Sequence, residues 1–350
     1  MEKTLSVVVP AYNSEHFLGR VLDSLLTPET AEALEIIVVD DGSRDGTAAL
    51  GRKYCAQWPG TVRLISQPNR GHGGALNTGI AAARGTYVRI LDSDDWAETR
   101  NLLPLLEALK TCTCDVVLTP YRSVDVRDPR ETLWDCGPAF HGRVWSLEDA
   151  LRHWEDFHPL MALHGVTYRR EFYCSLGLSL SEHVYYEDQE YVILPLCHAR
   201  TLLPLDLLIY NYRVGDQNQS MSPANQKKNL GSYQAVLNRL LAEYPRLPPE
   251  EAGREFFCRM LKSFLMSFFL AQMLGGPRRR QGREAAAEGM EALRVQLPGL
   301  FSRLKLPYGI LRLLSLLGVP GRVFDALLQP GHTCKNRKTT PQNKGTDYDV

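Results

Sequence analysis

Short runs of β-branched and apolar residues alternate with helical patterns through the first 91 residues of this 350-residue chain. The apolar runs lie at residues 5–9, 35–39, 62–65 and 87–91, and the helical patterns between them lie at residues 13–26, 47–58 and 73–84. Helices that join buried strands form right-handed crossover units, which place the strands parallel in one sheet and cover both of its faces. We therefore predict an α/β fold with a Rossmann-like, mainly parallel sheet flanked by helices.

The rest of the chain divides into three parts. Further helices are expected at residues 101–110, 146–157 and 187–198, and further strands at 115–120 and, near the far edge of the sheet, 205–212. The pattern is looser over residues 121–142. We expect one large domain over residues 1–224, a helical C-terminal extension over 225–330, and a polar, disordered tail over 331–350.

Composition excludes some classes of function. Lysine plus arginine and aspartate plus glutamate both number 40, so the formal net charge is zero, which argues against nucleic acid as a partner. The N-terminus leads directly into a strand pattern without a signal-peptide core, so we expect a cytoplasmic protein whose eight cysteines are reduced. Cys112 and Cys114 lie close together, but no second pair follows at zinc-finger spacing.

Two C-terminal segments are apolar. Residues 256–274 are interrupted by Arg259 and Lys262 and fall short of the roughly 20 apolar residues that span a bilayer. Residues 304–328 mix leucine and isoleucine with basic residues. These patterns fit either helices that pack on the large domain or a peripheral contact with the membrane interface, and both interpretations stay open.

Three carboxylates follow the strand expected at residues 87–91. Asp92, Asp94 and Asp95 are hard oxygen ligands of the kind that Mg²⁺ or Mn²⁺ prefers, and their mutual repulsion favours a cation nearby. In parallel sheets, ligands bind beyond the carboxyl ends of the strands. This cluster is therefore a candidate metal–diphosphate site, although a solvated turn with Asp95 capping the next helix is the simpler alternative.

Other strand ends lie at the same predicted edge. Asp40 and Asp41 end the second strand, and either could accept a hydrogen bond from a base or ribose, while Tyr12 after the first strand could stack on a base. Alternatively, Asp41 only forms a turn with Gly42. The glycine-rich segment at residues 69–77 could approach a phosphate, with Arg70 adding positive charge.

A second acidic pair, Glu187 and Asp188, begins a predicted helix. The helix dipole favours the ionised form of a carboxylate at this position, and an ionised carboxylate could take a proton from an acceptor hydroxyl. Ordinary charge patterning at a helix start is the alternative.

Three motifs together resemble the opening signature of family 2 glycosyltransferases: Leu-Ser-Val-Val-Val-Pro-Ala-Tyr-Asn at residues 5–13, Asp-Asp-Gly-Ser at residues 40–43 and Leu-Asp-Ser-Asp-Asp-Trp at residues 91–96. The resemblance covers about residues 4–220 and implies the GT-A fold, with a nucleotide-sugar half at about 1–120 and an acceptor half at about 121–224. It implies that the nucleotide is held by the first strand end and the Asp-Asp-Gly turn, and that ribose and the metal–diphosphate are held by the Asp-x-Asp element. The corresponding residues are Pro10, Ala11, Tyr12, Asn13 and Asp41 for the nucleotide, and Asp92, Ser93, Asp94 and Asp95 for the ribose and metal.

The resemblance also suggests roles further along the chain. Asp188, with Glu187 beside it, corresponds to the family's catalytic base, and Arg213, in the segment at residues 209–220, corresponds to a diphosphate contact. Many relatives have Ala-Arg-Asn after the glycine loop where this chain has Ala-Leu-Asn at residues 75–77, which leaves Arg70 as the nearer phosphate ligand.

The function implied is transfer of a sugar from a nucleotide-diphosphate donor, expected to be UDP-linked, to a hydroxyl of a glycan or lipid-linked acceptor, with inversion and with Mg²⁺ or Mn²⁺ as cofactor. Cell-surface polysaccharide synthesis in bacteria, at the cytoplasmic side of the membrane, fits this family. A sugar nucleotidyltransferase and a non-catalytic nucleotide-sugar-binding or scaffold protein are the alternatives. Aromatic and histidine side chains could line the acceptor pocket or belong to the core: Trp134, Trp145, Trp154, His158 and His164.

Overall fold

The computed structural model describes residues 3–128, 130–215, 229–275, 278–319 and 338–341. The chain forms two compact units, which are described separately. The first comprises residues 1–183, 199–215 and 335–350, and the second comprises residues 184–198 and 216–334.

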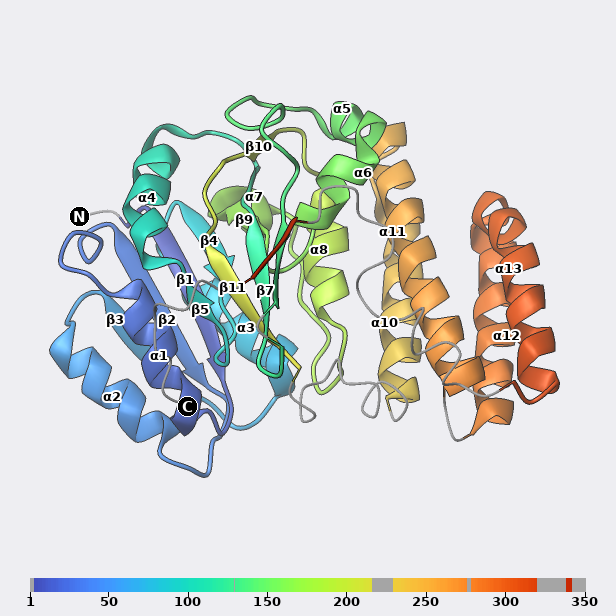
Figure 1. Ribbon diagram of the computed structural model, residues 1–350, viewed down its shortest axis with the longest axis horizontal. Coiled ribbons are helices and arrows are strands. Elements are labelled where there is room, and N and C mark those ends of the chain that lie inside the picture. The colour runs from blue at the N-terminus through green and yellow to red at the C-terminus, as the bar shows by residue number, and fades with distance from the viewer. Residues whose placement is uncertain (1–2, 129, 216–228, 276–277, 320–337, 342–350) are drawn as a thin grey trace. The chain divides into compact units, whose positions relative to one another are not determined.

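A seven-stranded sheet forms the centre of the first unit (Figure 1). Its strands, in spatial order, are β10 (Leu202–Pro204), β6 (Val116–Leu118), β9 (Val166–Arg169), β4 (Tyr87–Ile90), β1 (Leu5–Ala11), β2 (Leu34–Asp40) and β3 (Val62–Ser66). The strands β4, β1, β2 and β3 are parallel, as the alternating pattern predicted. The strand β9 runs antiparallel to both of its neighbours, so the sheet is mixed.

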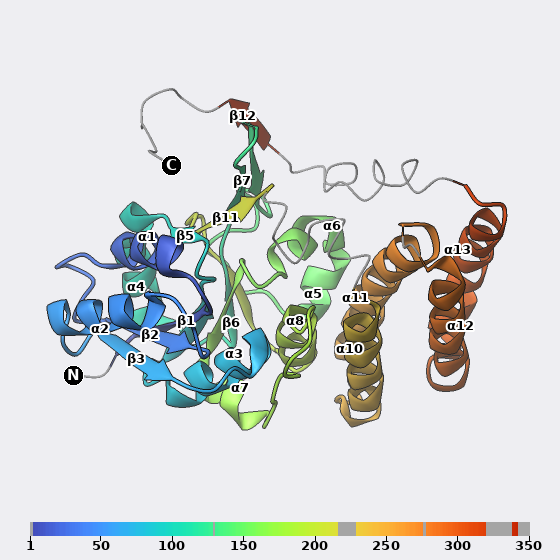
Figure 2. The ribbon, with the colours of Figure 1, turned by 90° about the horizontal axis from the view of Figure 1, so that it is seen from below.

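Helices flank this sheet as expected (Figures 1 and 2). The four that follow strand ends are α1 (Glu15–Leu25), α2 (Thr47–Gln57), α3 (Gly71–Ala82) and α4 (Leu102–Thr111). Each of the predicted helices in this region is present within two residues of its expected start or end. The strands β1 and β2 are buried along their whole length, which explains why they are continuously apolar rather than alternating.

A second sheet of five strands was not predicted. Its order is β12 (Lys338–Pro341), β8 (Arg130–Trp134), β7 (Tyr121–Asp125), β11 (Tyr210–Val214) and β5 (Trp96–Ala97). The strand expected at residues 205–212 near the edge of the main sheet was wrong, because β10 occupies that edge and β11 pairs with β5 and β7 instead. Within the expected tail, the structure describes only residues 338–341, which pair with β8.

Shorter helices complete the first unit: η1 (Thr99–Asn101), α5 (Leu147–Arg152), α6 (Trp154–Phe157), η2 (His158–Leu160) and α7 (Arg170–Ser175). The hydroxyl of Ser146 accepts a hydrogen bond from the backbone N–H of Asp149 at 3.0 Å, so the predicted cap is present. The helix expected over residues 146–157 is broken at His153, which leaves the helical conformation. Trp145 is buried among Phe140, His153 and Phe157 and belongs to the core.

The second unit is helical. Its helices are α8 (Asp188–Leu196), α10 (Leu230–Glu243), η3 (Tyr244–Arg246), α11 (Glu251–Phe269), the π-helical turn η4 (Leu270–Gly275), α12 (Arg279–Gln296) and α13 (Pro298–Leu316). The continuous segment Glu251–Gly275 is long and apolar enough to cross a membrane despite Arg259 and Lys262, so the estimate that it falls short was too strict. Most of it is buried within the protein, however, which is equally typical of a core helix.

Candidate functional site

The carboxyl ends of β1, β2 and β4 lie at one edge of the main sheet. Ala11 pairs with Asp40 in the parallel register, and the backbone N–H of Asp41 donates to the carbonyl of Ala11 at 2.9 Å. The hydroxyls of Ser14 and Ser93 are 2.8 Å apart and connect the segment after β1 to the segment after β4. The structure therefore brings together the three strand ends that the sequence placed at one crevice.

The segment after β1 presents an aromatic ring at this edge. Pro10 and Ala11 are buried in the strand, whereas Tyr12 is 49% exposed and available to stack on a planar group. Asn13 has a positive φ of 50°, which turns the chain sharply after Tyr12. Its backbone N–H donates to Ser43 Oγ at 3.0 Å, and its side-chain oxygen accepts from the backbone of Arg44 at 2.8 Å. These bonds fix the first strand end against the loop after β2.

Asp41 organises the glycine-rich segment. Its carboxylate is buried, and Oδ1 accepts hydrogen bonds from Gln67 Nε2 at 2.7 Å and from the backbone N–H of Arg70 at 2.9 Å. The side chain thus holds the start of α3 beside the end of β2. This role goes beyond the turn with Gly42 that the sequence offered as the simpler alternative.

The guanidinium of Arg70 is engaged within the protein. Its Nε donates to Glu182 at 2.9 Å, and a second nitrogen pairs with the other carboxylate oxygen of Glu182. The backbone N–H of His183 donates to the carbonyl of Arg70 at 3.1 Å, and Gly71 has a φ of +76° where a Cβ would meet that same nitrogen. Glu182 therefore competes with any phosphate for Arg70.

Asp95 is tied to strand β11. Its Oδ2 accepts from the hydroxyl of Tyr210 at 2.5 Å, and its Oδ1 accepts from the backbone N–H of Arg213 at 2.7 Å. The same Tyr210 hydroxyl accepts from the backbone N–H of Asp92 at 3.1 Å. Asp95 is fully buried and both of its oxygens have donors, so it shapes the aspartate turn instead of capping a following helix.

Asp92 lies beside two histidines. Its Oδ1 is 2.9 Å from Nε2 of His72, and ligand atoms of Asp92, Asp95 and His164 all lie within 4.8 Å of one another. These three could hold a metal ion, and two of them, Asp92 and Asp95, belong to the predicted set of Asp92, Asp94 and Asp95. Asp94 is half-buried in the turn between them.

The pKa values of Asp92, Asp95 and His164 shift in different directions in the folded protein. Burial acts to raise the pKa of Asp92, but the charge and hydrogen bond of His72 outweigh it and lower the pKa. Burial and the neighbouring charges of Asp94 and Asp92 raise the pKa of Asp95 well above its usual value. Burial lowers the pKa of His164 to about 4, so its imidazole is neutral near pH 7, as a metal ligand must be. Of the two carboxylates, Asp92 is therefore more readily ionised than Asp95 and is the stronger anionic ligand.

Arg213 and the segment around it are only partly described. Its backbone N–H holds Asp95, and its guanidinium carbon lies 5.0 Å from the ring centroid of Phe17 on α1. The rest of the predicted segment, residues 216–220, lies outside the described residues. Leu76 is buried, and the side chain of Asn77 forms hydrogen bonds with the backbone N–H and the carbonyl of Leu180 at 2.8 and 2.9 Å.

Glu187 and Asp188 belong to the second unit. Glu187 is buried, whereas Asp188 is half-exposed at the first position of α8. The preceding Tyr186 stacks on Tyr233 of α10 with ring centroids 4.0 Å apart, which anchors this helix start. Of the two carboxylates, Asp188 is the one that solvent reaches.

Sequence reasoning missed His72 and Tyr210 as parts of the site. Both lie in segments that the motifs already marked, residues 69–77 and 209–220, but their roles depend on contacts with Asp92 and Asp95 across the fold. His164, expected either to line the acceptor pocket or to belong to the core, offers a ligand atom within 4.8 Å of those of Asp92 and Asp95 and stacks on Tyr212 with centroids 4.1 Å apart.

The sequence of this chain is similar to those of known proteins. Residues 6–154 match the family model described as glycosyl transferase family 2. The uncharacterized glycosyltransferase EpsJ of Bacillus subtilis (strain 168) is 30% identical over 215 residues, which make up 60% of this chain and 60% of EpsJ. The matched part therefore spans less than two thirds of that relative's length.

Solved structures share the fold. The S. aureus TarS 1-349 structure in complex with UDP-GlcNAc superposes with a TM-score of 0.64 at 20% identity, over 93% of this chain and 92% of that one. The mannosyltransferase PcManGT from Pyrobaculum calidifontis, in complex with GDP-Man and Mn²⁺, has a TM-score of 0.50 at 17% identity, over 95% and 89% of the two chains. At these identities the likeness establishes the fold alone.

Proposed function

Because this chain belongs to glycosyltransferase family 2 and has the GT-A fold, we propose that it transfers a sugar from a UDP-linked donor to a hydroxyl of a glycan or lipid-linked acceptor, with inversion at the anomeric carbon. The observation that carries this proposal is the shared edge of β1, β2 and β4, where exposed Tyr12, buried Asp41 and ionised Asp92 follow the three strand ends. An aromatic ring, a hydrogen-bond acceptor and a metal-binding carboxylate match the base, ribose and diphosphate of a nucleotide sugar.

Asp92 would carry most of the metal contact. A divalent cation, Mg²⁺ or Mn²⁺, would offset the charge that develops on the departing nucleoside diphosphate. Asp92 is anionic and His164 is neutral, and a ligand atom of Asp95 lies within 4.8 Å of a ligand atom of each. Asp94, partly open in the same turn, would complete the ligands from the exposed side. Manganese in the structure of PcManGT is consistent with this assignment.

Asp188 would act as the general base. In an inverting transfer, the acceptor hydroxyl attacks the anomeric carbon from the side opposite the diphosphate and loses its proton to a carboxylate. Asp188 is solvent-accessible and begins α8, where the helix dipole stabilises its ionised form. Glu187 is buried and suits a supporting role. Arg213 and Arg70 would contact the diphosphate, the latter only after exchanging Glu182 for phosphate.

The surface of helix α13 supports the proposal of a membrane-associated glycan pathway. Helix α13 exposes Leu306, Ile310 and Leu313 at helical spacing, and its C-cap residue Leu317 continues the stripe. Each of the four is between 51% and 73% exposed. Basic Arg303, Lys305 and Arg312 are exposed on the same helix. An apolar stripe with neighbouring cations fits the headgroup region of an anionic membrane. We place the enzyme at the cytoplasmic face of a bacterial membrane, in cell-surface polysaccharide synthesis.

A turnover assay tests the proposal. The purified protein would be incubated with UDP-GlcNAc, UDP-glucose, UDP-galactose and GDP-mannose, with and without Mn²⁺, and the release of nucleoside diphosphate would be followed. Slow, metal-dependent hydrolysis of one donor without acceptor supports a transferase. Tight binding without any turnover would indicate a non-catalytic nucleotide-sugar-binding protein, and release of pyrophosphate from a nucleoside triphosphate and sugar phosphate would indicate a nucleotidyltransferase.

A further inference from the structure

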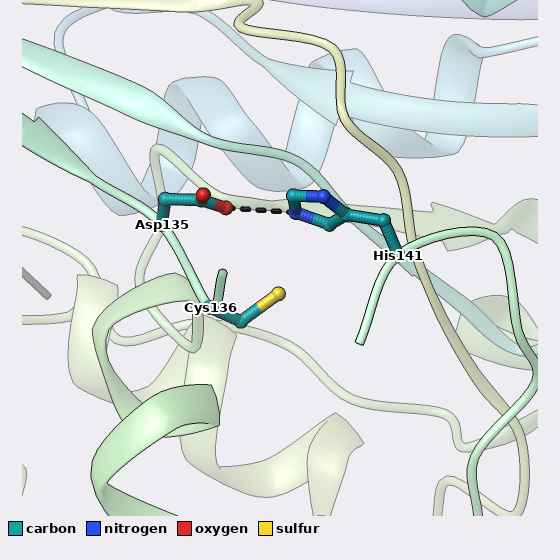
Figure 3. Close-up of side chains that lie close together, drawn as sticks. All are labelled: Asp135, Cys136 and His141. Carbon is teal, nitrogen blue, oxygen red and sulfur yellow. Dashed lines mark hydrogen bonds and ion pairs between the residues drawn. The ribbon is translucent and has the colours of Figure 1, made fainter. Parts of the chain in front are cut away.

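A cysteine, a histidine and an aspartate that the proposed reaction does not use converge in the first unit (Figure 3). The carboxylate of Asp135, the thiol of Cys136 and the imidazole of His141 each offer an atom within 4.8 Å of the others. Asp135 Oδ1 lies 2.8 Å from His141 Nε2, and the Cys136 side chain extends below the same ring nitrogen (Figure 3). None of these residues belongs to the aspartate site at the end of β4.

The local sequence brings these side chains together. Asp135 and Cys136 directly follow β8, and the residues after them, Gly-Pro-Ala-Phe at 137–140, form a turn. Gly137 has a φ of +90°, and the backbone N–H of Phe140 donates to its carbonyl at 3.1 Å. The turn reverses the chain direction, so His141 faces Asp135 and Cys136, the two residues before the turn.

The surroundings of His141 match those of a metal ligand. Its side chain is only 9% exposed, and its second ring nitrogen, Nδ1, is buried and lies 3.8 Å from a carboxylate oxygen of Asp206, with no hydrogen-bond partner within the described part of the chain. A carboxylate on the far nitrogen of a ligating histidine fixes the tautomer and strengthens the ligand. With Nε2 directed at Asp135 and Cys136, Asp206 would take that supporting role by closing the 3.8 Å gap to hydrogen-bond distance.

We propose that Asp135, Cys136 and His141 form a binding site for Zn²⁺. Thiolate, imidazole and carboxylate are the ligands that zinc uses at tetrahedral sites, whereas Mg²⁺ and Mn²⁺ favour oxygen ligands. Three protein ligands leave the fourth position to water. On binding, Cys136 releases its thiol proton to solvent. The proton between His141 Nε2 and Asp135 is lost from Nε2, and Nδ1, opposite Asp206, carries the proton of the neutral imidazole, so that Nε2 and the Asp135 carboxylate both bind the ion. Zinc would then fix the loop between β8 and α5.

Cobalt substitution tests this site without reference to catalysis. Full-length protein, freed of metal with a chelator under reducing conditions, would be titrated with Co²⁺ and then Zn²⁺. We expect one equivalent of Co²⁺ to give a thiolate-to-metal charge-transfer band in the near ultraviolet, which Zn²⁺ abolishes. Cys136→Ser should remove the band, whereas Cys174→Ser, at an exposed free cysteine, should retain it. A band that persists in Cys136→Ser, or no band in the wild type, would overturn the proposal.

Three further variants distinguish loss of the site from misfolding and from adventitious metal binding. Cys136 is fully buried, so Cys136→Ser is compared with Asp135→Asn, an isosteric change at a less buried position. Asp135→Asn should weaken Co²⁺ binding while the metal-free variant still unfolds in one cooperative transition, and Asp206→Asn should weaken Co²⁺ binding by up to about 10–100-fold. Asp92→Asn should leave this titration unaltered. Equal affinity in all variants would mean adventitious surface binding only.

Discussion

The hydroxyl of Tyr210 donates a 2.5 Å hydrogen bond to the buried carboxylate of Asp95, across 115 residues of sequence. The same oxygen accepts the backbone N–H of Asp92 at 3.1 Å, so one phenol fixes the turn that carries the proposed metal ligands. The second sheet, through β11, thereby sets the geometry at the end of β4 in the main sheet.

Replacing Tyr210 with phenylalanine should therefore loosen this turn. Tyr210→Phe leaves a buried oxygen of Asp95 without its donor, a loss that costs about 1–3 kcal/mol in the free energy of unfolding. Urea denaturation measures that loss, and calorimetry should show weaker binding of UDP with Mn²⁺. Tyr185→Phe, at a half-exposed tyrosine, is the matched control and should change neither quantity. Wild-type stability and affinity in Tyr210→Phe would show that the phenol does not hold the turn.

Glu35 should make stability depend on pH. It is buried and accepts from Ser6 Oγ and Arg63 at 2.6 Å each and from the backbone of Arg84 at 2.8 Å. Burial opposes ionisation, but these donors prevail and lower its pKa. A carboxylate whose pKa is lower in the folded state stabilises that state above its unfolded pKa of about 4.3, and this stabilisation is lost as pH falls through the folded pKa.

Glu35→Gln tests this dependence directly. It should cost about 1–3 kcal/mol near pH 7, because charged hydrogen bonds are replaced by weaker ones, and the difference from wild type should shrink below about pH 4. Denaturant unfolding across pH 3–8 provides the measurement. Glu107→Gln, in an exposed pair with Lys110, should change stability by less than about 0.5 kcal/mol. A difference that stays constant with pH would rule out ionised Glu35 as its source.

Asp188→Asn should separate chemistry from binding. Removal of a general base lowers kcat by about 10²–10⁴-fold, whereas donor affinity should stay near that of the wild type because the base acts in the transition state. Steady-state turnover and calorimetric donor titration give the two quantities. Glu187→Gln, at the buried neighbour, is expected to retain more activity. Near-normal turnover in Asp188→Asn would exclude it as the base.

The stripe on α13 should govern membrane binding. Leu306→Glu combined with Leu313→Glu places two charges on the exposed face and should abolish co-sedimentation with vesicles that contain anionic lipid, while folding is retained because both side chains are exposed. Val144→Glu alters an exposed valine in the first unit and serves as the control. If the double variant sediments with vesicles as the wild type does, the stripe is not a membrane contact.

Local patterns were sufficient to predict the first half of the main sheet. The strands β1, β2, β3 and β4 are continuous apolar runs between helices, and each of their ends could be placed at one edge from topology alone. The strand β9 was missed because four residues, Val166–Arg169, carry no periodicity, and its antiparallel pairing is decided by distant neighbours.

In the candidate site, too, local sequence patterns predicted some features, while others depend on contacts formed in the folded chain. The aspartates at 92, 94 and 95 were found from their position after a strand, but their different environments follow from His72, His164 and Tyr210, which only the folded chain brings near. A sequence pattern identifies which residues bear charge. Which of them is easily ionised depends on contacts between residues that are 20 to 118 positions apart in the sequence.

The most direct test of the central claim is calorimetric titration of UDP, and then of GDP, into the wild type and Asp92→Asn, each with and without Mn²⁺. Glu148→Gln removes a charge from an exposed helix and is the control. We predict that UDP binds only with Mn²⁺, that Asp92→Asn abolishes this binding, and that Glu148→Gln preserves it. Folded wild-type protein that binds neither nucleotide, or binds UDP equally well in Asp92→Asn, would contradict the account.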